Sequence, residues 1–121
     1  MQLITILGQT SSGKSDLAIE LVKNIASKGK KACVLGCDSR QMYKGLSIGT
    51  GKIQGQWHFD KEINKKVFKF EGVSHFMIDF VDASLNYNLQ NYLSDFYNLM
   101  LEIQNSFDYV VLVGEIGRAH V

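Results

Sequence analysis

The residues with the clearest chemical meaning lie near the amino terminus, in the stretch GQTSSGKS. Gly8, Gly13, Lys14 and Ser15 satisfy the spacing G-x-x-x-x-G-K-[S/T], which binds phosphate groups where a strand precedes it and a helix follows. The glycines let backbone N–H groups converge on an anion at the amino end of the helix, where the helix dipole also favours negative charge. The lysine adds a positive charge, and the serine hydroxyl suits a Mg²⁺ ion that bridges phosphate oxygens.

This loop predicts a phosphate site with a bound Mg²⁺ ion, and Ser15 is the expected metal ligand. The residues expected to bind the phosphate groups are Gly8, Gln9, Thr10, Ser11, Ser12, Gly13, Lys14 and Ser15. The alternative is a tight glycine turn followed by a solvated lysine. The loop alone does not name a reaction, because kinases, nucleotide hydrolases and transferases all use such loops.

A second group of polar residues follows the apolar stretch KACVLGC, which is typical of a buried strand. The carboxyl end of that strand would bring Asp38 and Ser39 to the same edge of the sheet as the phosphate loop. A carboxylate in this place can act as a general base or hold Mg²⁺ through water, and the residues by themselves favour neither role.

Apolar periodicity predicts the elements that carry these groups. Gln2–Leu7 has the β-branched pattern of a buried parallel strand. A helix is expected from Lys14 to Gly29, with Leu17, Leu21 and Ile25 on one apolar stripe and Ala18 and Val22 beside it. Cys33 and Cys37 lie on the second strand without a further Cys or His pair at zinc spacing, so we expect core thiols.

The second half of the chain predicts a loop over Gly45–Gly55, an exposed strand in KKVFKFEG and a third strand of the main sheet in VSHFMIDFVD. Apolar residues from Leu89 to Ile103 then recur at three and four positions, which predicts a helix whose stripe from Tyr92 to Ile103 is core. DYVVLVG is a further strand. This order predicts an α/β fold, a P-loop NTPase-like, doubly wound and mostly parallel sheet that binds ligands beyond the carboxyl ends of its strands.

Composition fits one globular domain, since 45% of the 121 residues are hydrophobic and 11% are aromatic. The formal net charge is only +1, so a nucleic-acid partner needs a local basic face. No apolar run is long enough for a bilayer, and MQLITILG lacks the features of a signal peptide. We therefore expect a cytoplasmic protein without a membrane partner.

The segment DSRQMYKGLSIGTGK, Asp38–Lys52, closely resembles the one that follows the second strand in tRNA dimethylallyltransferases, also called tRNA isopentenyltransferases. The residues that match the family pattern are Asp38, Ser39, Gln41, Tyr43, Lys44, Gly45, Leu46, Ile48, Gly49, Thr50 and Lys52. GQTSSGKSDLAIEL, SHFMIDFVD and VVLVG are similar to further family segments. The chain departs from the pattern at Arg40, Ile53 and Ser74, and it has GEIG where the family has a Gly-Gly-Thr-Gly turn.

The resemblance implies an enzyme that transfers a dimethylallyl group from dimethylallyl diphosphate to N6 of the adenine next to the anticodon of tRNA. Gly13, Lys14 and Ser15 with Mg²⁺ would stabilise the leaving diphosphate, and Thr10 would line its pocket. Asp38 would accept the N6 proton as general base. Contacts to the anticodon stem-loop would come from Asp38, Ser39, Arg40 and Gln41.

Other polar and aromatic residues have weaker claims. Lys44 and Lys52 either pair with phosphates or are solvated, and His75 is expected to pack at the end of a strand. Trp57, Phe59 and Phe70 could stack on bases, although aromatic residues more often cover a sheet.

Two other enzymes share the loop: a small P-loop kinase, and an adenylate isopentenyltransferase that uses the same donor with a free nucleotide. The resemblance spans residues 1–114, the amino-terminal part of a family member, which we interpret as a partial catalytic domain. The last seven residues, EIGRAHV, read as the translation of a common sequencing adaptor, so we expect Glu115–Val121 to be non-native. The isolated fragment is expected to be inactive and the intact protein monomeric.

Overall fold

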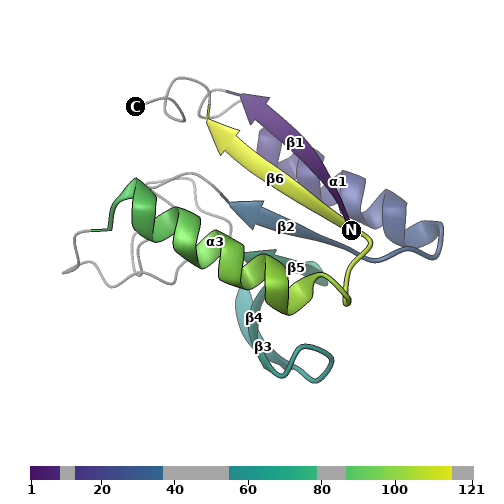
Figure 1. Ribbon diagram of the computed structural model, residues 1–121. Helices are drawn as coiled ribbons and strands as arrows, with labels where there is room; N and C mark the ends of the chain where they lie inside the picture. The colour runs from purple at the N-terminus through teal and green to yellow at the C-terminus, as the bar shows by residue number, and fades with distance from the viewer. Residues whose placement is uncertain (9–12, 37–54, 79–86, 116–121) are drawn as a thin grey trace.

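The computed structural model describes residues 1–8, 13–36, 55–78 and 87–115. They form a six-stranded sheet in the order β1-β6-β2-β5-β4-β3, with one helix on each face (Figure 1). The strands are β1 (Gln2–Gly8), β2 (Ala32–Gly36), β3 (Gln56–Asp60), β4 (Lys65–Phe70), β5 (Val73–Phe76) and β6 (Tyr109–Glu115), and the helices are α1 (Lys14–Ser27) and α3 (Leu89–Ile103).

Four strands of the sheet are parallel, and two form an antiparallel hairpin at one side. β6 pairs with both β1 and β2, and β2 pairs with β5, all in the parallel sense. β4 pairs antiparallel with β5 and with the edge strand β3. The predicted α/β fold with a mostly parallel sheet is therefore confirmed.

Local sequence accounts for the helix boundaries. α1 begins after Gly13 and stops before Gly29, and both glycines have a left-handed backbone, with φ of 79° and 81°. α3 begins at a reciprocal cap: the Asn88 side chain accepts a hydrogen bond from the backbone N–H of Asn91, and the Asn91 side chain accepts one from Asn88.

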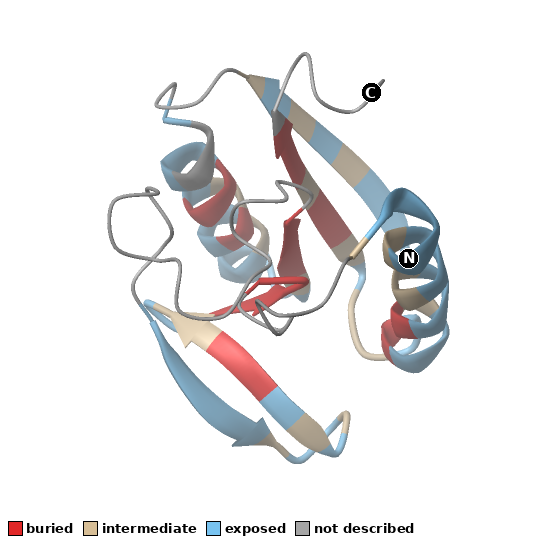
Figure 2. Cartoon of the chain, turned by 90° about the vertical axis from the view of Figure 1, so that its left-hand side faces the viewer, coloured by how far each residue is buried: buried red, intermediate tan, exposed pale blue. Residues whose placement is uncertain are grey.

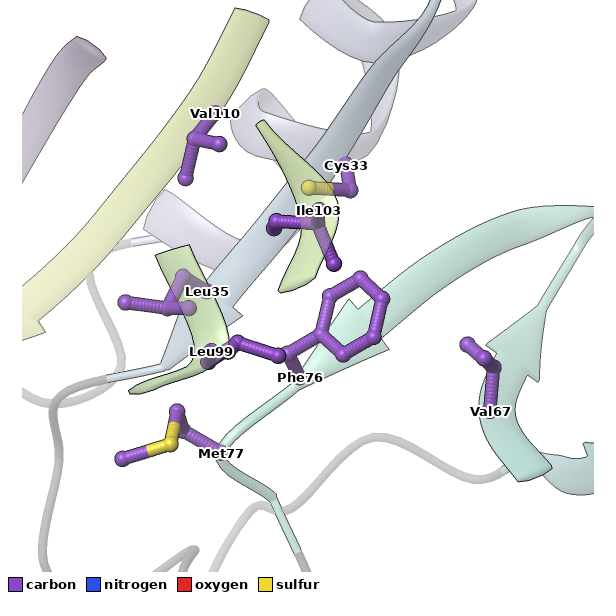
Figure 3. Close-up of a cluster of buried hydrophobic side chains, with 8 residues drawn as sticks. All are labelled: Cys33, Leu35, Val67, Phe76, Met77, Leu99, Ile103 and Val110. Carbon is purple, nitrogen blue, oxygen red and sulfur yellow. The ribbon is translucent and has the colours of Figure 1, made fainter. Parts of the chain in front are cut away.

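Two apolar clusters hold the helices against the sheet. The first cluster packs α3 against one face of the sheet through Leu99 and Ile103. Its buried residues, drawn in Figure 3, are Cys33, Leu35, Val67, Phe76, Met77, Leu99, Ile103 and Val110. The second cluster packs α1 on the opposite face through Ala18, Ile19, Val22, Val34, Val73, Val111 and Val113. β2 and β6 contribute alternate residues to the two clusters, so their central parts are buried on both sides (Figure 2).

The structure corrects two expectations about helix faces. In α1 the buried residues are Ala18, Ile19 and Val22, whereas Leu17 is exposed, because the helix turns a different stripe to the sheet. In α3 the stripe from Tyr92 to Ile103 is core only in part. Ile103 is buried and Tyr92, Phe96 and Met100 pack partly buried against the same cluster, but Leu93 is exposed.

The structure also corrects the expectation for the hairpin. KKVFKFEG was expected to form an exposed strand, but β4 lies between β5 and β3 and buries Val67 and Phe68. The exposed strand is its partner β3, which no sequence pattern indicated. The third predicted strand is confirmed over Val73–Phe76, and residues 79–82 of that prediction lie outside the described residues.

One edge and part of one face of the sheet are apolar and are not covered by any described element. β1 is the edge strand, and its Leu3 and Leu7 are 55% and 54% exposed. A groove of about 480 Å³ lies between β1 and α3, with Leu3, Phe96, Tyr97 and Leu101 in its lining. An open edge of this kind favours association with another polypeptide.

Candidate functional site

The parallel strands end at a common edge of the sheet, which places the amino end of α1 among their carboxyl ends. β1 ends at Gly8, opposite Glu115 of β6, and β2 ends at Gly36, opposite Val113. The predicted phosphate loop leaves this edge after Gly8, and Asp38 follows β2 by two residues. In a sheet of this type ligands bind at this edge.

Gly13 gives the amino end of α1 the properties of an anion site. Gly13 is the N-cap, and no side chain of the described residues caps the helix there. Its carbonyl accepts the first helical hydrogen bond, from the N–H of Leu17 at 3.1 Å. The N–H groups of the first turn have no partner within a helix, so an anion is a suitable partner for them.

The space at Gly13 is open as well. A Cβ atom at this position would meet no atom within 4 Å, and the φ of 79° disfavours any side chain. The backbone conformation therefore favours glycine here, and the residue leaves room for a ligand.

Gly36, at the end of β2, is packed more tightly than Gly13. A Cβ atom there would lie 3.1 Å from Cγ1 of Ile78, and the Gly36 carbonyl accepts a hydrogen bond from the Tyr92 hydroxyl at 3.2 Å. Helix α3 thus braces the point from which the chain runs toward Asp38. Tyr92 was predicted only as a core residue. The sequence signal for its position is the Asn88–Asn91 cap, because the cap marks the start of α3 and so places Tyr92 in the first turns of the helix, near this edge.

Predicted site residues lie both inside and outside the described residues. The structure places the backbones of Gly8, Gly13, Lys14 and Ser15 at the ligand edge. Gln9, Thr10, Ser11 and Ser12, and also Asp38, Ser39, Arg40 and Gln41, lie outside the described ranges, as do Lys44, Lys52 and Cys37. Their roles remain predictions.

Two buried groups belong to the core rather than to the site. His75 is 1% exposed, and its Nδ1 donates to the Val73 carbonyl at 3.0 Å. Burial lowers the pKa of His75, which favours the neutral imidazole, and its Nε2 has no hydrogen-bond partner among the described residues. The prediction that His75 packs on a strand is confirmed. Burial raises the pKa of Cys33 to about 12, in agreement with a core thiol.

No group of three or more His, Cys, Asp or Glu side chains in the described ranges could hold a metal ion. Among the same residues, no helix has the length and apolar character to cross a membrane. Of the three aromatic residues with two predicted uses, Phe70 is partly buried and packs against the α1 cluster, whereas Trp57 and Phe59 are exposed.

Comparison with known proteins assigns the family. The model of the IPP transferase family matches residues 41–115, more than half of the chain and the whole region between the Asp38 block and β6. The chain belongs to this family.

Individual relatives agree with the assignment. A tRNA dimethylallyltransferase of Syntrophus aciditrophicus is 36% identical over 115 residues, which are 95% of this chain and 33% of the relative. One of Elusimicrobium minutum is 32% identical over 114 residues, 94% of this chain and 34% of the relative. This family member therefore spans about a third of the length of the curated relatives it matches.

Solved structures show the same partial coverage. The full-length tRNA isopentenylpyrophosphate transferase of Bacillus halodurans matches 96% of this chain with a TM-score of 0.72 and 29% identity, over 33% of its own length. A eukaryotic dimethylallyltransferase acting on tRNA has the same fold, with a TM-score of 0.67 at 23% identity, over 24% of its length.

Proposed function

We propose that the complete protein transfers a dimethylallyl group from dimethylallyl diphosphate to N6 of the adenine next to the anticodon of tRNA. The observation that carries the proposal is the amino end of α1, which no described side chain caps, at the edge where β2 leads into the Asp38 block. The names of the relatives support the reaction, since they describe tRNA dimethylallyltransferases.

In the proposed reaction N6 attacks the allylic carbon that bears the diphosphate. A C–N bond forms, the C–O bond breaks, and the electron pair leaves with the diphosphate. The N–H groups at Gly13 and the start of α1, together with Lys14, would stabilise this charge more strongly as the bond breaks. Asp38 would accept the proton that N6 loses.

Ser15 follows the proposed anion site at the start of α1, and a serine hydroxyl is an oxygen ligand of the kind that Mg²⁺ accepts, so Ser15 would hold a Mg²⁺ ion beside the diphosphate. When bound, the ion would neutralise negative charge on the diphosphate.

The decisive test is single-turnover transfer to an anticodon stem-loop by the complete protein over a series of Mg²⁺ concentrations. Asp38→Asn keeps the shape of the side chain but cannot take the proton, so we expect a rate lower by roughly 10²- to 10⁴-fold with donor affinity unchanged. Lys14→Ala is the contrast, since it should weaken donor binding. Recovery of the Asp38→Asn rate at high Mg²⁺ would return Asp38 to the role of an indirect metal ligand.

The kinase alternative predicts a different ligand preference. The chain has only two arginines, Arg40 and Arg118, and small kinases typically use several to clamp the transferred phosphoryl group. We expect dimethylallyl diphosphate to bind better than ATP in competition calorimetry. ATP binding tighter by tenfold, with phosphoryl transfer to a small acceptor, would contradict the proposal.

A further inference from the structure

The β3–β4 hairpin presents aromatic and basic side chains on one of its faces. Trp57 lies opposite Phe68 in the antiparallel register, and Phe59 lies opposite Lys66, so these four side chains share a face. Trp57 and Phe59 are 45% and 58% exposed although both are large aromatic residues. β3 is the edge strand farthest from β1, and it is exposed along most of its length (Figure 2).

The other face of the hairpin has a different composition. Val67 is buried in the cluster with α3, and the lysines on that face form ion pairs: Lys65 with Glu102 at 3.1 Å, and Lys69 with Asp60 at 3.8 Å. Alternation along the strands puts Asp60 on this second face. The aromatic face of the hairpin therefore carries no carboxylate.

Positive charge is concentrated in the hairpin. Residues 56–70 contain four lysines against one aspartate and one glutamate, a surplus of two positive charges, in a chain whose net charge is +1. Lys66, on the aromatic face, is exposed and forms no ion pair with any described residue. The hairpin as a whole is therefore mildly basic, and Lys66 is the one lysine of its two strands on the aromatic face, where its charge can attract a phosphate.

The Trp57 ring is held in position from one side. It meets the buried Phe68 ring edge to face, with centroids 5.5 Å apart at 72°. Trp57 and Lys66 also line a cleft of about 410 Å³ between the hairpin and α3. Two acidic residues on the α3 side of this cleft already have partners, because Asp95 accepts a hydrogen bond from Tyr87 and Glu102 pairs with Lys65.

We propose that the aromatic face of the hairpin, formed by Trp57, Phe59 and Lys66, binds a single-stranded segment of RNA. Exposed aromatic rings stack on unpaired bases, and a lysine beside them that has no ion pair among the described residues suits the phosphate between two bases. The choice of RNA rests on the proposed function, because a tRNA substrate offers such unpaired bases. A paired stem would not suit this face, since its bases are already stacked.

Trp57 is the only tryptophan of the chain, so its fluorescence reports on this face alone. We expect an anticodon stem-loop RNA or an unpaired oligonucleotide to quench the fluorescence of the 121-residue chain at saturation. A duplex RNA of equal length should quench much less. Anisotropy of labelled RNA in the same titration measures binding by any part of the protein.

Two substitutions and two matched controls test the contact. Phe59→Ala should weaken the quenching interaction roughly 5- to 100-fold, the usual effect of losing one base stack. Lys66→Ala should reduce the dependence of log K on log salt by about 0.7, the value for one phosphate of a single strand. Leu17→Ala removes an exposed apolar side chain from α1, and Lys28→Ala removes an exposed lysine at its C-cap; we expect neither to change the binding.

The experiments distinguish a wrong RNA-binding proposal for the hairpin from a wrong proposed function. RNA binding by anisotropy without quenching, or with unchanged affinity in Phe59→Ala and Lys66→Ala, would overturn the hairpin contact but leave the prenyl transfer proposal untouched. Equal quenching by duplex RNA would also overturn it. Prenyl transfer is measured separately, in the complete protein.

Discussion

Gly13→Ala is the substitution that best separates backbone conformation from ligand binding at the phosphate site. Gly13, Gly29 and Gly72 have nearly the same left-handed backbone, with φ of 79°, 81° and 78°, and a Cβ atom at any of the three would meet nothing within 4 Å. Alanine therefore strains the backbone equally at each position without a clash. Only Gly13 lies at the amino end of α1.

The expected loss of stability is similar for the three alanine variants. A left-handed conformation costs about 1–2 kcal/mol for a residue with a side chain, and alanine recovers part of this by restricting the unfolded chain. We expect each variant to lose about 1 kcal/mol of unfolding free energy. In a chain of this size that corresponds to a melting temperature lower by roughly 3–6 °C.

Diphosphate binding should differ among the same variants. The methyl group of Gly13→Ala would take up open space beside the N–H groups that we assign to the anion, so we expect inorganic diphosphate with Mg²⁺ to bind at least tenfold more weakly. That change corresponds to about 1.4 kcal/mol. Gly29→Ala and Gly72→Ala should bind like the unmodified chain.

Calorimetric titration with diphosphate and thermal unfolding of the three variants would measure both effects. Equal diphosphate affinity in Gly13→Ala and Gly29→Ala would refute the assignment of the amino end of α1 as the phosphate site. A stability loss confined to Gly13→Ala would instead refute the argument that backbone strain is the same at the three glycines.

Three further outcomes concern the core and the open edge. The 121-residue chain should self-associate through β1, and Leu3→Lys should shift sedimentation velocity profiles toward monomer; a wild-type monomer at tens of micromolar would contradict this. Because the pKa of His75 is lowered in the folded state from the ordinary 6.5, the unfolded state binds more protons below pH 6.5, so stability should fall as the pH drops from there toward the folded pKa. In His75→Phe the unfolding free energy from chemical denaturation should change less with pH between pH 6.5 and 5. An unchanged pH dependence would mean that other groups cause it. Cys33, buried and with its pKa raised to about 12, should be alkylated only on unfolding, and fast labelling of native Cys33 in pulsed alkylation with mass spectrometry would show that the core opens.

Most helices and strands can be predicted from the sequence, because each depends on the periodicity of apolar residues within a short segment. The strand before Gly8, the helix from Lys14 to the Gly29 stop, the helix from Leu89 to Ile103 and the last strand all follow from runs of apolar residues and their caps. The phosphate loop can also be predicted from the sequence alone, because its spacing of glycine, lysine and serine lies within eight residues.

Helix burial shows where periodicity stops being informative. A period of 3.6 residues identifies a stripe, but the stripe that is buried depends on the neighbour that covers it. α1 turns Ala18, Ile19 and Val22 to the sheet and leaves Leu17 in solvent, although all four have apolar side chains. α3 leaves Tyr97 exposed because β1, beside it, has no covering element among the described residues.

The sequence by itself determined the chemistry that the protein can offer: a loop for phosphate, a carboxylate after the second strand and the match to a tRNA-modifying family. Only the tertiary structure decided the strand order, because pairing between distant strands is set by the whole sheet and not by either strand alone. That order leaves β1 at one open edge and places the hairpin with Trp57 at the other. The same pairing brings Phe59 opposite Lys66, since side chains that face each other across two strands share a side of the sheet wherever they stand in the sequence.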